Sequence, residues 1–311
     1  RNYTAFVLSG GGARGAFQVG ALRALLEAGE RPDVVVGTSI GAWNGAWIAR
    51  DPSLAGMRDL EEVWRSLDTL QVLLGTEPGR RTRHRAQAGM RLLMAARRVA
   101  RGQPSLYSDT GLRQLLAIHQ GETTFAELRL PLRIIAADLT TGTRAVIESG
   151  RVGDAILASS AMPGVFPPIC IDNHVYVDGG TLDNCSLETA LALGARRIVV
   201  VDVGYDSYEE PSPLWCTELT PAALREHGGS MHAMAVVLQR MTQVVCRYQY
   251  SQALKRLPRG VELRFLSPGA GVAGSILDFD KAGQWIEQGY RATRARLAQD
   301  EPRGLPVADV S

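Results

Sequence analysis

Two short turns near the start of the chain place glycines and a serine where acyl chemistry could occur. Gly10, Gly11 and Gly12 form the first turn, and GTSIG, at 37–41, forms the second. Each turn follows an apolar run and precedes a helical pattern, so both are expected at helix N-termini, where backbone N–H groups favour negative charge. A G-x-S-x-G turn between a strand and a helix exposes the serine hydroxyl. These residue types predict a nucleophilic serine beside amides that stabilise an oxyanion.

The first turn also fits a dinucleotide-binding loop, because Gly10, Gly12 and Gly15 have the G-x-G-x-x-G spacing. That site needs an acidic residue at the end of the second strand, about 20 residues further on, to bind the ribose. Here the second strand runs directly into GTSIG, which holds no acid. A phosphate-binding P-loop is excluded as well, since no Gly-Lys-Ser/Thr follows the glycines. No cofactor is therefore expected.

A serine hydroxyl needs a base within hydrogen-bonding reach, and three aspartates stand at predicted strand ends. Asp178 follows the alternating segment VYV and precedes two glycines, which allow the backbone to approach the serine turn closely. Asp138 and Asp202 also follow strands. For these two we favour a structural interpretation, in which the carboxylate accepts loop N–H groups.

None of the histidines is placed as clearly as Asp178. His227 and His232 lie at the start of a long helical pattern, where surface or capping roles are the favoured interpretation, and a Ser–His–Asp triad through either one stays open as an alternative. His174 is expected to be exposed in a turn. The remaining two are His84 and His119.

The rest of the chain alternates strand and helix patterns. Strands are predicted at 4–9, 33–36, 132–137, 145–148, about 175–177, 198–203 and 261–266. Helices are predicted at 15–28, after the serine turn, and at 57–70, 112–119, 187–193, 231–256 and 281–298. This alternation predicts an α/β fold with a mostly parallel central sheet flanked by helices on both faces. We expect one domain over 1–300 and a loosely ordered tail at 301–311.

Composition narrows the class of protein further. The 311 residues are 45% hydrophobic with a net charge of +2, so nothing demands a nucleic-acid partner. The four cysteines form no C-x-x-C pair and no cluster with histidine, which argues against a metal site or a disulfide scaffold and favours a reducing compartment. No apolar run reaches about 18 residues, so no membrane-spanning helix is expected. A cytoplasmic location, with peripheral contact at a membrane, is the expectation; the oligomeric state is left open.

One basic segment interrupts the even mixture of charges. Residues 79–102 contain eight arginines and no acidic residue, with apolar side chains interleaved. Such a pattern suits an amphipathic helix on an anionic membrane surface, and equally a solvated arginine face on a packed helix. Its place in the chain, within about 71–107, is where a helical insertion or lid over the site would lie.

Four segments together resemble the patatin-like phospholipase family. They are SGGGARGAF (9–17), GTSIGAWNG (37–45), ASSAMPGVFPP (158–168) and DGGTLDN (178–184), in this order. LDFD at 277–280 is similar to the closing segment of the family. The resemblance implies a three-layer α/β/α fold and a lipid acyl hydrolase of the phospholipase A, lysophospholipase or carboxylesterase type, which uses no metal. Its substrate would be a phospholipid or another acyl-ester lipid.

The resemblance also implies roles for individual residues. Ser39 would be the nucleophile and Asp178 the base of a dyad that needs no histidine, with an acyl-serine intermediate. The oxyanion hole would be shaped by Gly10, Gly11, Gly12 and Arg14. The nucleophile elbow would depend on Gly37 and Gly41, and the supporting loop after the base on Gly179 and Gly180.

Two departures from the family pattern stand out. Asn184-Cys185-Ser186 lacks a proline that is common after this asparagine, and Trp43 and Trp47 are bulkier than the usual small residues. Neither touches the dyad, but both can reshape the acyl pocket. Acyl transfer to an alcohol or a thiol by the same acyl-serine stays an alternative activity, and a catalytically silent, membrane-associated signalling module is a second alternative.

Overall fold

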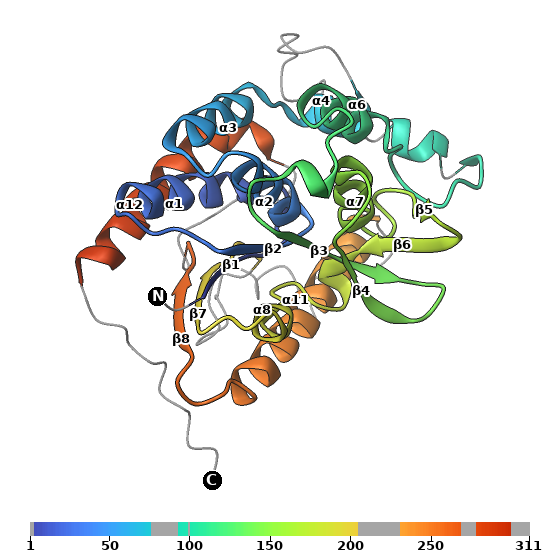
Figure 1. The fold of residues 1–311 in the computed structure, drawn as a ribbon. Coiled ribbons are helices and arrows are strands. Elements are labelled where there is room, and N and C mark those ends of the chain that lie inside the picture. The colour runs from blue at the N-terminus through green and yellow to red at the C-terminus, as the bar shows by residue number, and fades with distance from the viewer. Residues whose placement is uncertain (1–2, 76–92, 99, 205–230, 269–277, 300–311) are drawn as a thin grey trace.

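The computed structural model describes residues 3–75, 93–98, 100–204, 231–268 and 278–299 (Figure 1). Within them an eight-stranded sheet has the order β5-β6-β3-β2-β1-β7-β8, and β4 also pairs with β3. The strands are β1 Thr4–Leu8, β2 Val34–Thr38, β3 Leu132–Asp138, β4 Thr143–Ile147, β5 Ile169–Ile171, β6 His174–Asp178, β7 Arg197–Val201 and β8 Glu262–Leu266.

The centre of the sheet is parallel and one side is antiparallel. β3, β2, β1, β7 and β8 pair in parallel, whereas β4, β5 and β6 join as antiparallel strands. Because parallel strands end at the same edge, the loops that follow β1 and β2 lie together. The predicted α/β class with a mostly parallel sheet is confirmed.

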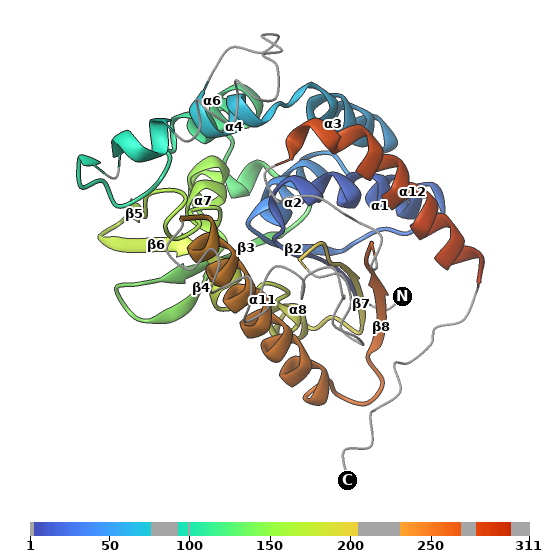
Figure 2. The same ribbon diagram turned by 180° about the vertical axis from the view of Figure 1, so that it is seen from behind.

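Helices cover both faces of this sheet, as Figures 1 and 2 show. On one face, side chains such as Phe6 and Leu8 pack with α1, α2, α3, α7 and α12. On the other, Ala5 and Val7 pack with α8 and α11. The alternation follows from the two-residue period of a strand. The helices are α1 Gly15–Glu27, α2 Ile40–Arg50, α3 Leu54–Ser66, α4 Thr69–Leu74, α6 Thr110–His119, α7 Val152–Ser159, α8 Leu187–Ala192, α11 Met231–Lys255 and α12 Ala282–Ala298.

The structure corrects several predicted element boundaries. The single helix expected at 57–70 is two helices, because the Asp68 side chain accepts a hydrogen bond from Gln71 N at 2.8 Å and starts α4. The strand expected at 198–203 ends at Val201. Strand β5 and helix α7 were not predicted; both are short, and α7 is buried along most of its length, which removes the amphipathic pattern that reveals a surface helix.

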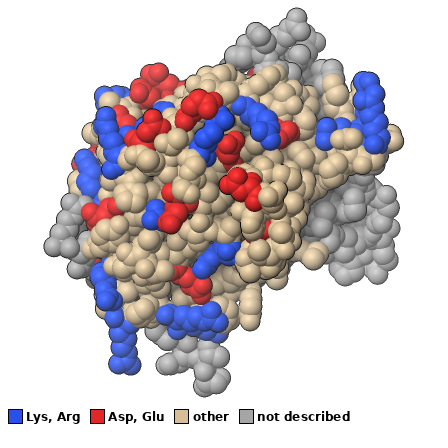
Figure 3. Space-filling model, turned by 45° about the vertical axis from the view of Figure 1, so that its right-hand side comes forward, with Lys and Arg blue, Asp and Glu red and all other residues tan. Residues whose placement is uncertain are grey.

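The basic segment 79–102 is described only in part. Residues 93–98 are helical, with Leu93 and Met94 exposed, whereas 79–92 and Val99 lie outside the described residues, as does the predicted tail at 301–311. On the face drawn in Figure 3, basic and acidic side chains are interspersed. Among the described helices, none combines the length and the apolar character needed to cross a bilayer.

Candidate active site

Ser39 occupies a sharp turn between β2 and α2. Its backbone has φ 54° and ψ −121°, a left-handed conformation that a non-glycine residue adopts only under strain. The turn is tight because α2 passes directly over the end of β1: a Cβ on Gly41 would lie 2.1 Å from the carbonyl oxygen of Leu8. A Cβ on Gly37 would likewise lie 2.5 Å from the Gly41 carbonyl oxygen. The side chain of Ser39 is consequently held at the end of the sheet.

The sheet register brings Asp178 to the same level as Ser39. Thr38, the last residue of β2, pairs with Ile135 of β3, and the next residue of β3, Ala136, pairs with Asp178 of β6. Only β3 lies between the strand that ends at Asp178 and the strand that leads to Ser39, although 139 positions separate the two residues in the sequence. The chain then crosses β3 so closely that a Cβ on Gly179 would lie 2.2 Å from the Ile135 carbonyl oxygen.

Ser39 Oγ donates a hydrogen bond directly to Asp178 Oδ2 at 2.7 Å. Gly180 N donates to the other carboxylate oxygen, Oδ1, at 2.8 Å. Both residues are buried, with 8% of Ser39 and 5% of Asp178 exposed. Burial raises the pKa of Asp178 from 3.8 to about 6, against the opposing effect of the Ser39 and Gly180 hydrogen bonds. A carboxyl group with such a pKa is a better proton acceptor than a solvated aspartate.

The glycine turn at 10–12 lies next to Ser39. A Cβ on Gly10 would be 3.0 Å from Ser39 Cβ and 2.6 Å from Asn184 Oδ1, so only glycine fits there. Asn184 accepts a hydrogen bond from Gly10 N at 3.0 Å and donates one to the Gly10 carbonyl oxygen at 3.3 Å. The N–H of Gly10 thus already has an acceptor, which leaves the next amides of the turn as the candidates for holding an oxyanion.

Ser159, at the end of α7, supports the serine turn and was not singled out from the sequence. Its Oγ accepts a hydrogen bond from Ser39 N at 2.7 Å and donates one to the Ile135 carbonyl oxygen at 2.5 Å. The Ser39 amide is therefore satisfied inside the protein. Ser159 and Asn184 both lie in family segments quoted above, but serine and asparagine have many structural roles, and the sequence contains no spacing that identifies these two.

A buried polar network fixes the start of α1 beneath the glycine turn. Gln18 donates to the carbonyl oxygens of Ser9 at 2.8 Å and Val201 at 3.1 Å. Asn44 donates to Gln18 Oε1 at 2.9 Å and accepts from Trp64 Nε1 at 2.9 Å. Since these groups are buried and paired, they link the ends of β1 and β7 to helices α2 and α3.

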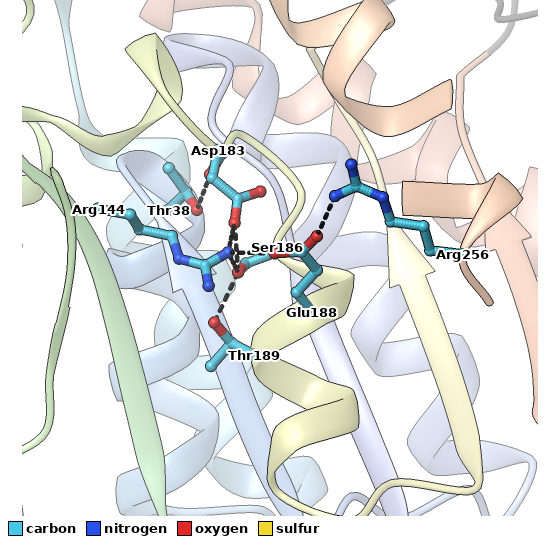
Figure 4. A network of polar contacts seen from close by, with 7 residues as sticks. All are labelled: Thr38, Arg144, Asp183, Ser186, Glu188, Thr189 and Arg256. Atoms are coloured by element: carbon cyan, nitrogen blue, oxygen red, sulfur yellow. Dashed lines mark hydrogen bonds and ion pairs between the residues drawn. The ribbon is translucent and has the colours of Figure 1, made fainter. Parts of the chain in front are cut away.

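A second network holds the loop that carries Asn184 (Figure 4). Arg144 of β4 donates to Asp183 Oδ2 at 2.5 Å, and Ser186 Oγ donates to the same oxygen at 2.6 Å. Thr38 Oγ1 donates to the Asp183 carbonyl oxygen at 3.3 Å, which ties the loop to the end of β2. Glu188, at the start of α8, accepts a hydrogen bond from Arg144 Nη1 at 3.4 Å and another from Arg256 Nη1 at 3.2 Å, so it connects Arg256 to the network.

The other predicted acids have the structural role that was favoured for them. Asp138 accepts from Thr140 N at 2.8 Å and contacts His174 Nδ1 at 2.7 Å, and these contacts lower the pKa of Asp138 to about 2 despite burial. Asp202 Oδ1 accepts from Gly204 N at 3.1 Å. Ser39 and Asp178 contact each other with no histidine between them. The structure does not describe His84, His227 or the side chain of His232.

Arg14 and the two elbow tryptophans are buried. Arg14 lies in the short helix η1 (Gly12–Arg14), and its backbone N–H donates to the Gly11 carbonyl oxygen at 3.3 Å. Trp43 and Trp47 pack against the ring of His119, with centroids 5.9 Å and 6.0 Å apart. Burial and the nearby Arg50 lower the pKa of His119.

Among the described residues, no group of three or more His, Cys, Asp or Glu side chains is arranged to hold a metal ion.

The family model described as "Patatin-like phospholipase" matches residues 6–191, which is more than half of the chain and includes Ser39 and Asp178. The chain belongs to the patatin-like phospholipase family. Patatin-like phospholipase domain-containing protein 7 of Mus musculus is 31% identical over 205 residues, which cover 65% of this chain and 14% of that protein. Lysophospholipase NTE1 of Phaeosphaeria nodorum is 29% identical over 315 residues, covering 97% of this chain and 19% of that protein.

These patatin-like relatives are much longer proteins, since the chain spans less than a fifth of the length of either one. Among solved structures, VipD from Legionella pneumophila matches with a TM-score of 0.48 and 16% identity, covering 96% of this chain and 67% of that one.

Proposed function

We propose that this chain hydrolyses carboxylic esters of lipids through a dyad of Ser39 and Asp178. The observation that carries the proposal is the 2.7 Å hydrogen bond from Ser39 Oγ to Asp178 Oδ2, made by a serine in a strained turn between a strand and a helix. Membership of the patatin-like phospholipase family supports a lipid substrate, as does the name lysophospholipase carried by one relative.

In the first step Ser39 Oγ attacks the ester carbonyl carbon, and its proton passes to Asp178 Oδ2. The carbonyl oxygen then carries the negative charge of a tetrahedral intermediate. When the carbon–oxygen bond of the leaving group breaks, Asp178 returns the proton to the departing alcohol or lysolipid, and an acyl-serine forms. In the second step water attacks this acyl-serine, Asp178 takes a proton from the water, and that proton returns to Ser39 as the fatty acid leaves.

We assign the oxyanion to the amides of Gly11 and Gly12, at the N-terminus of η1 and α1. Gly10 is given a structural role, because its N–H is bonded to Asn184. Arg14 adds positive charge at the same turn. Fixed amides contribute most at the moment when charge develops on the oxygen, and loss of one such donor costs about 2.7–4 kcal/mol.

The basic segment 79–102 is proposed as a peripheral contact with an anionic membrane. Its eight arginines without an acidic residue, and the exposed Leu93 and Met94 of its described part, support this role. Replacing four of the arginines with glutamine is expected to weaken binding to anionic vesicles; unchanged binding would remove the segment from the membrane contact.

The dyad is tested by labelling with a fluorophosphonate and by mass spectrometry of products from a mixed lipid pool. Wild-type protein is expected to be labelled at Ser39 and to release free fatty acid, whereas Ser39→Ala and Asp178→Asn do neither. His227→Ala and His232→Ala are expected to keep most of the activity. A folded but inactive variant of either histidine would replace the dyad with a triad.

A further inference from the structure

Helix α11 (Met231–Lys255) is apolar on two opposite faces. Cys246 and Tyr250 are buried on its inner side, where Tyr250 belongs to the core cluster on the sheet and packs on Phe265 with ring centroids 5.4 Å apart. On the opposite side of the helix, Met241, Val244, Val245 and Tyr248 are 58%, 56%, 41% and 64% exposed. Their spacing of three, four and seven residues places all four on one face. The solvent-facing side of a helix in a globular protein is normally polar, so this apolar surface is expected to have a partner.

This apolar face lies on the outside of the molecule. Figure 2 shows α11 running diagonally in front of the sheet, with no described element across its outer side. Among the described residues, these four side chains are exposed to solvent on that side.

The charge of the helix indicates the chemistry of that partner. α11 contains Arg240, Arg247 and Lys255 and no acidic residue. The next four residues add Arg259 and Arg256, of which Arg256 is ion-paired with Glu188 at 3.2 Å. Exposed aliphatic side chains and a tyrosine flanked by basic residues match the headgroup region of an anionic bilayer, where tyrosine is favoured because its ring is apolar and its hydroxyl polar.

The helix is also bonded to the candidate active site. Cys246 Sγ donates to the carbonyl oxygen of Gly180 at 2.9 Å, and the N–H of the same Gly180 donates to Asp178 Oδ1. The short helix that contains Gly180, η3 (Gly179–Thr181), packs against α11. The outer face of α11 is thus on the opposite side of the helix from its contact with the loop that carries the proposed base.

The geometry points to the outer face of α11, formed by Met241, Val244, Val245 and Tyr248, as the surface that docks this protein on an anionic lipid bilayer. The inference rests on the proposed function, because a lipid bilayer would supply the substrate class proposed for Ser39. It concerns residues outside the basic segment 79–102, and it adds a second lipid contact on a different helix.

The test compares two double variants of the full chain. Met241→Gln with Val244→Gln removes two exposed aliphatic side chains from the docking face, and Ile118→Gln with Leu139→Gln removes two others, 71% and 57% exposed, from elsewhere. Binding to vesicles of phosphatidylcholine with phosphatidylglycerol is measured by co-sedimentation in a Ser39→Ala background, so that the lipid is not consumed. Thermal unfolding confirms that each variant folds.

The docking-face variant is expected to bind vesicles about tenfold more weakly, while the control binds as the parent does. With Ser39 restored, the ratio of activity on vesicle phospholipid to activity on a water-soluble short-chain ester should fall for the docking-face variant alone. Equal vesicle binding by the two variants overturns the proposal. So does intact vesicle binding together with loss of self-association in sedimentation velocity, which would assign the face to a second copy of the chain.

Failure of the proposed function is distinguishable from failure of this inference. If wild-type protein cleaves no ester, vesicle binding by the Ser39→Ala variants still reports on α11. If esters are cleaved but the substitutions in α11 leave vesicle binding unchanged, the proposed dyad is retained and the proposed docking surface is wrong.

Discussion

The side-chain amide of Asn184 contacts both backbone polar groups of Gly10, accepting from its N–H at 3.0 Å and donating to its carbonyl oxygen at 3.3 Å. The contact joins the loop after the proposed base to the turn proposed to hold the oxyanion. If the glycine turn holds the oxyanion as proposed, these bonds give Asn184 the role of a positioning residue that orients the turn.

Replacing Asn184 with alanine should lower kcat for a soluble ester by about 10²-fold with little change in KM, because the glycine amides lose their fixed orientation in the transition state. Steady-state kinetics measures this. Ser105→Ala is the control, since it removes another buried, hydrogen-bonded side chain whose partners, Arg98 and Tyr107, lie outside the glycine turn. An equal fall in kcat for the two variants would mean that any buried polar deletion lowers activity, and would contradict a specific role for Asn184.

The dependence of kcat/KM on pH should report the titration of Asp178. Its pKa in the folded protein is raised to about 6 by burial, and the residue accepts a proton only as the carboxylate. Activity on a soluble ester should therefore rise with pH through about 6 and level off above about pH 7. A profile that stays flat from about pH 4.5 to pH 8 would contradict this assignment.

Asp178→Asn should remove a pH dependence of stability as well as the reaction. A folded-state pKa above the unfolded value of 3.8 means that the folded protein holds the proton more tightly, so the contribution of Asp178 to stability is present below about pH 4 and is lost as pH rises to about 6. The asparagine variant should be more stable than wild type near neutral pH, and this difference should vanish near pH 4. Urea unfolding at several pH values measures it, and kcat should fall by about 10²–10⁴-fold.

Ser159→Ala should destabilise the protein by about 1–3 kcal/mol, because it leaves the Ser39 N–H and the Ile135 carbonyl oxygen buried without their partner. Labelling of Ser39 by a fluorophosphonate should slow in parallel. Ser160→Ala, one residue further along, is the control and should change the free energy of unfolding by less than about 0.5 kcal/mol. Similar losses in the two variants would mean that Ser159 has no special role at the elbow.

Gly41→Ala should destabilise the protein by about 1–3 kcal/mol or more, since the new Cβ would lie 2.1 Å from the Leu8 carbonyl oxygen and neither backbone can move freely. Gly153→Ala provides the comparison within another helix. Its Cβ would meet nothing closer than Leu116 Cβ at 3.9 Å, so the change should be neutral or stabilise by up to about 1 kcal/mol. Thermal unfolding of both variants decides whether close approach, and not helix propensity, requires glycine at 41.

Much of this architecture could be predicted from local patterns. The apolar runs around Phe6 and Val35, each followed by a glycine-containing turn and a helical period, specify strand, turn and helix because these signals depend on neighbours only a few residues away. The same local character made Ser39 recognisable, since a G-x-S-x-G corner works only between a strand and a helix. Asp178 could be chosen as a candidate for its place at a strand end.

Tertiary structure decided the relationships that no local pattern contains. That Asp178 meets Ser39 depends on the register of β3 with two different strands, and that Gly10 is bonded by Asn184 depends on the return of the chain 174 residues later. The raised pKa of Asp178 and the support from Ser159 have the same origin, because burial and hydrogen bonding are set by what surrounds a group. The sequence alone determined which chemical groups are available; packing of distant segments determined which of them touch, and hence which carboxyl group has its pKa raised by burial.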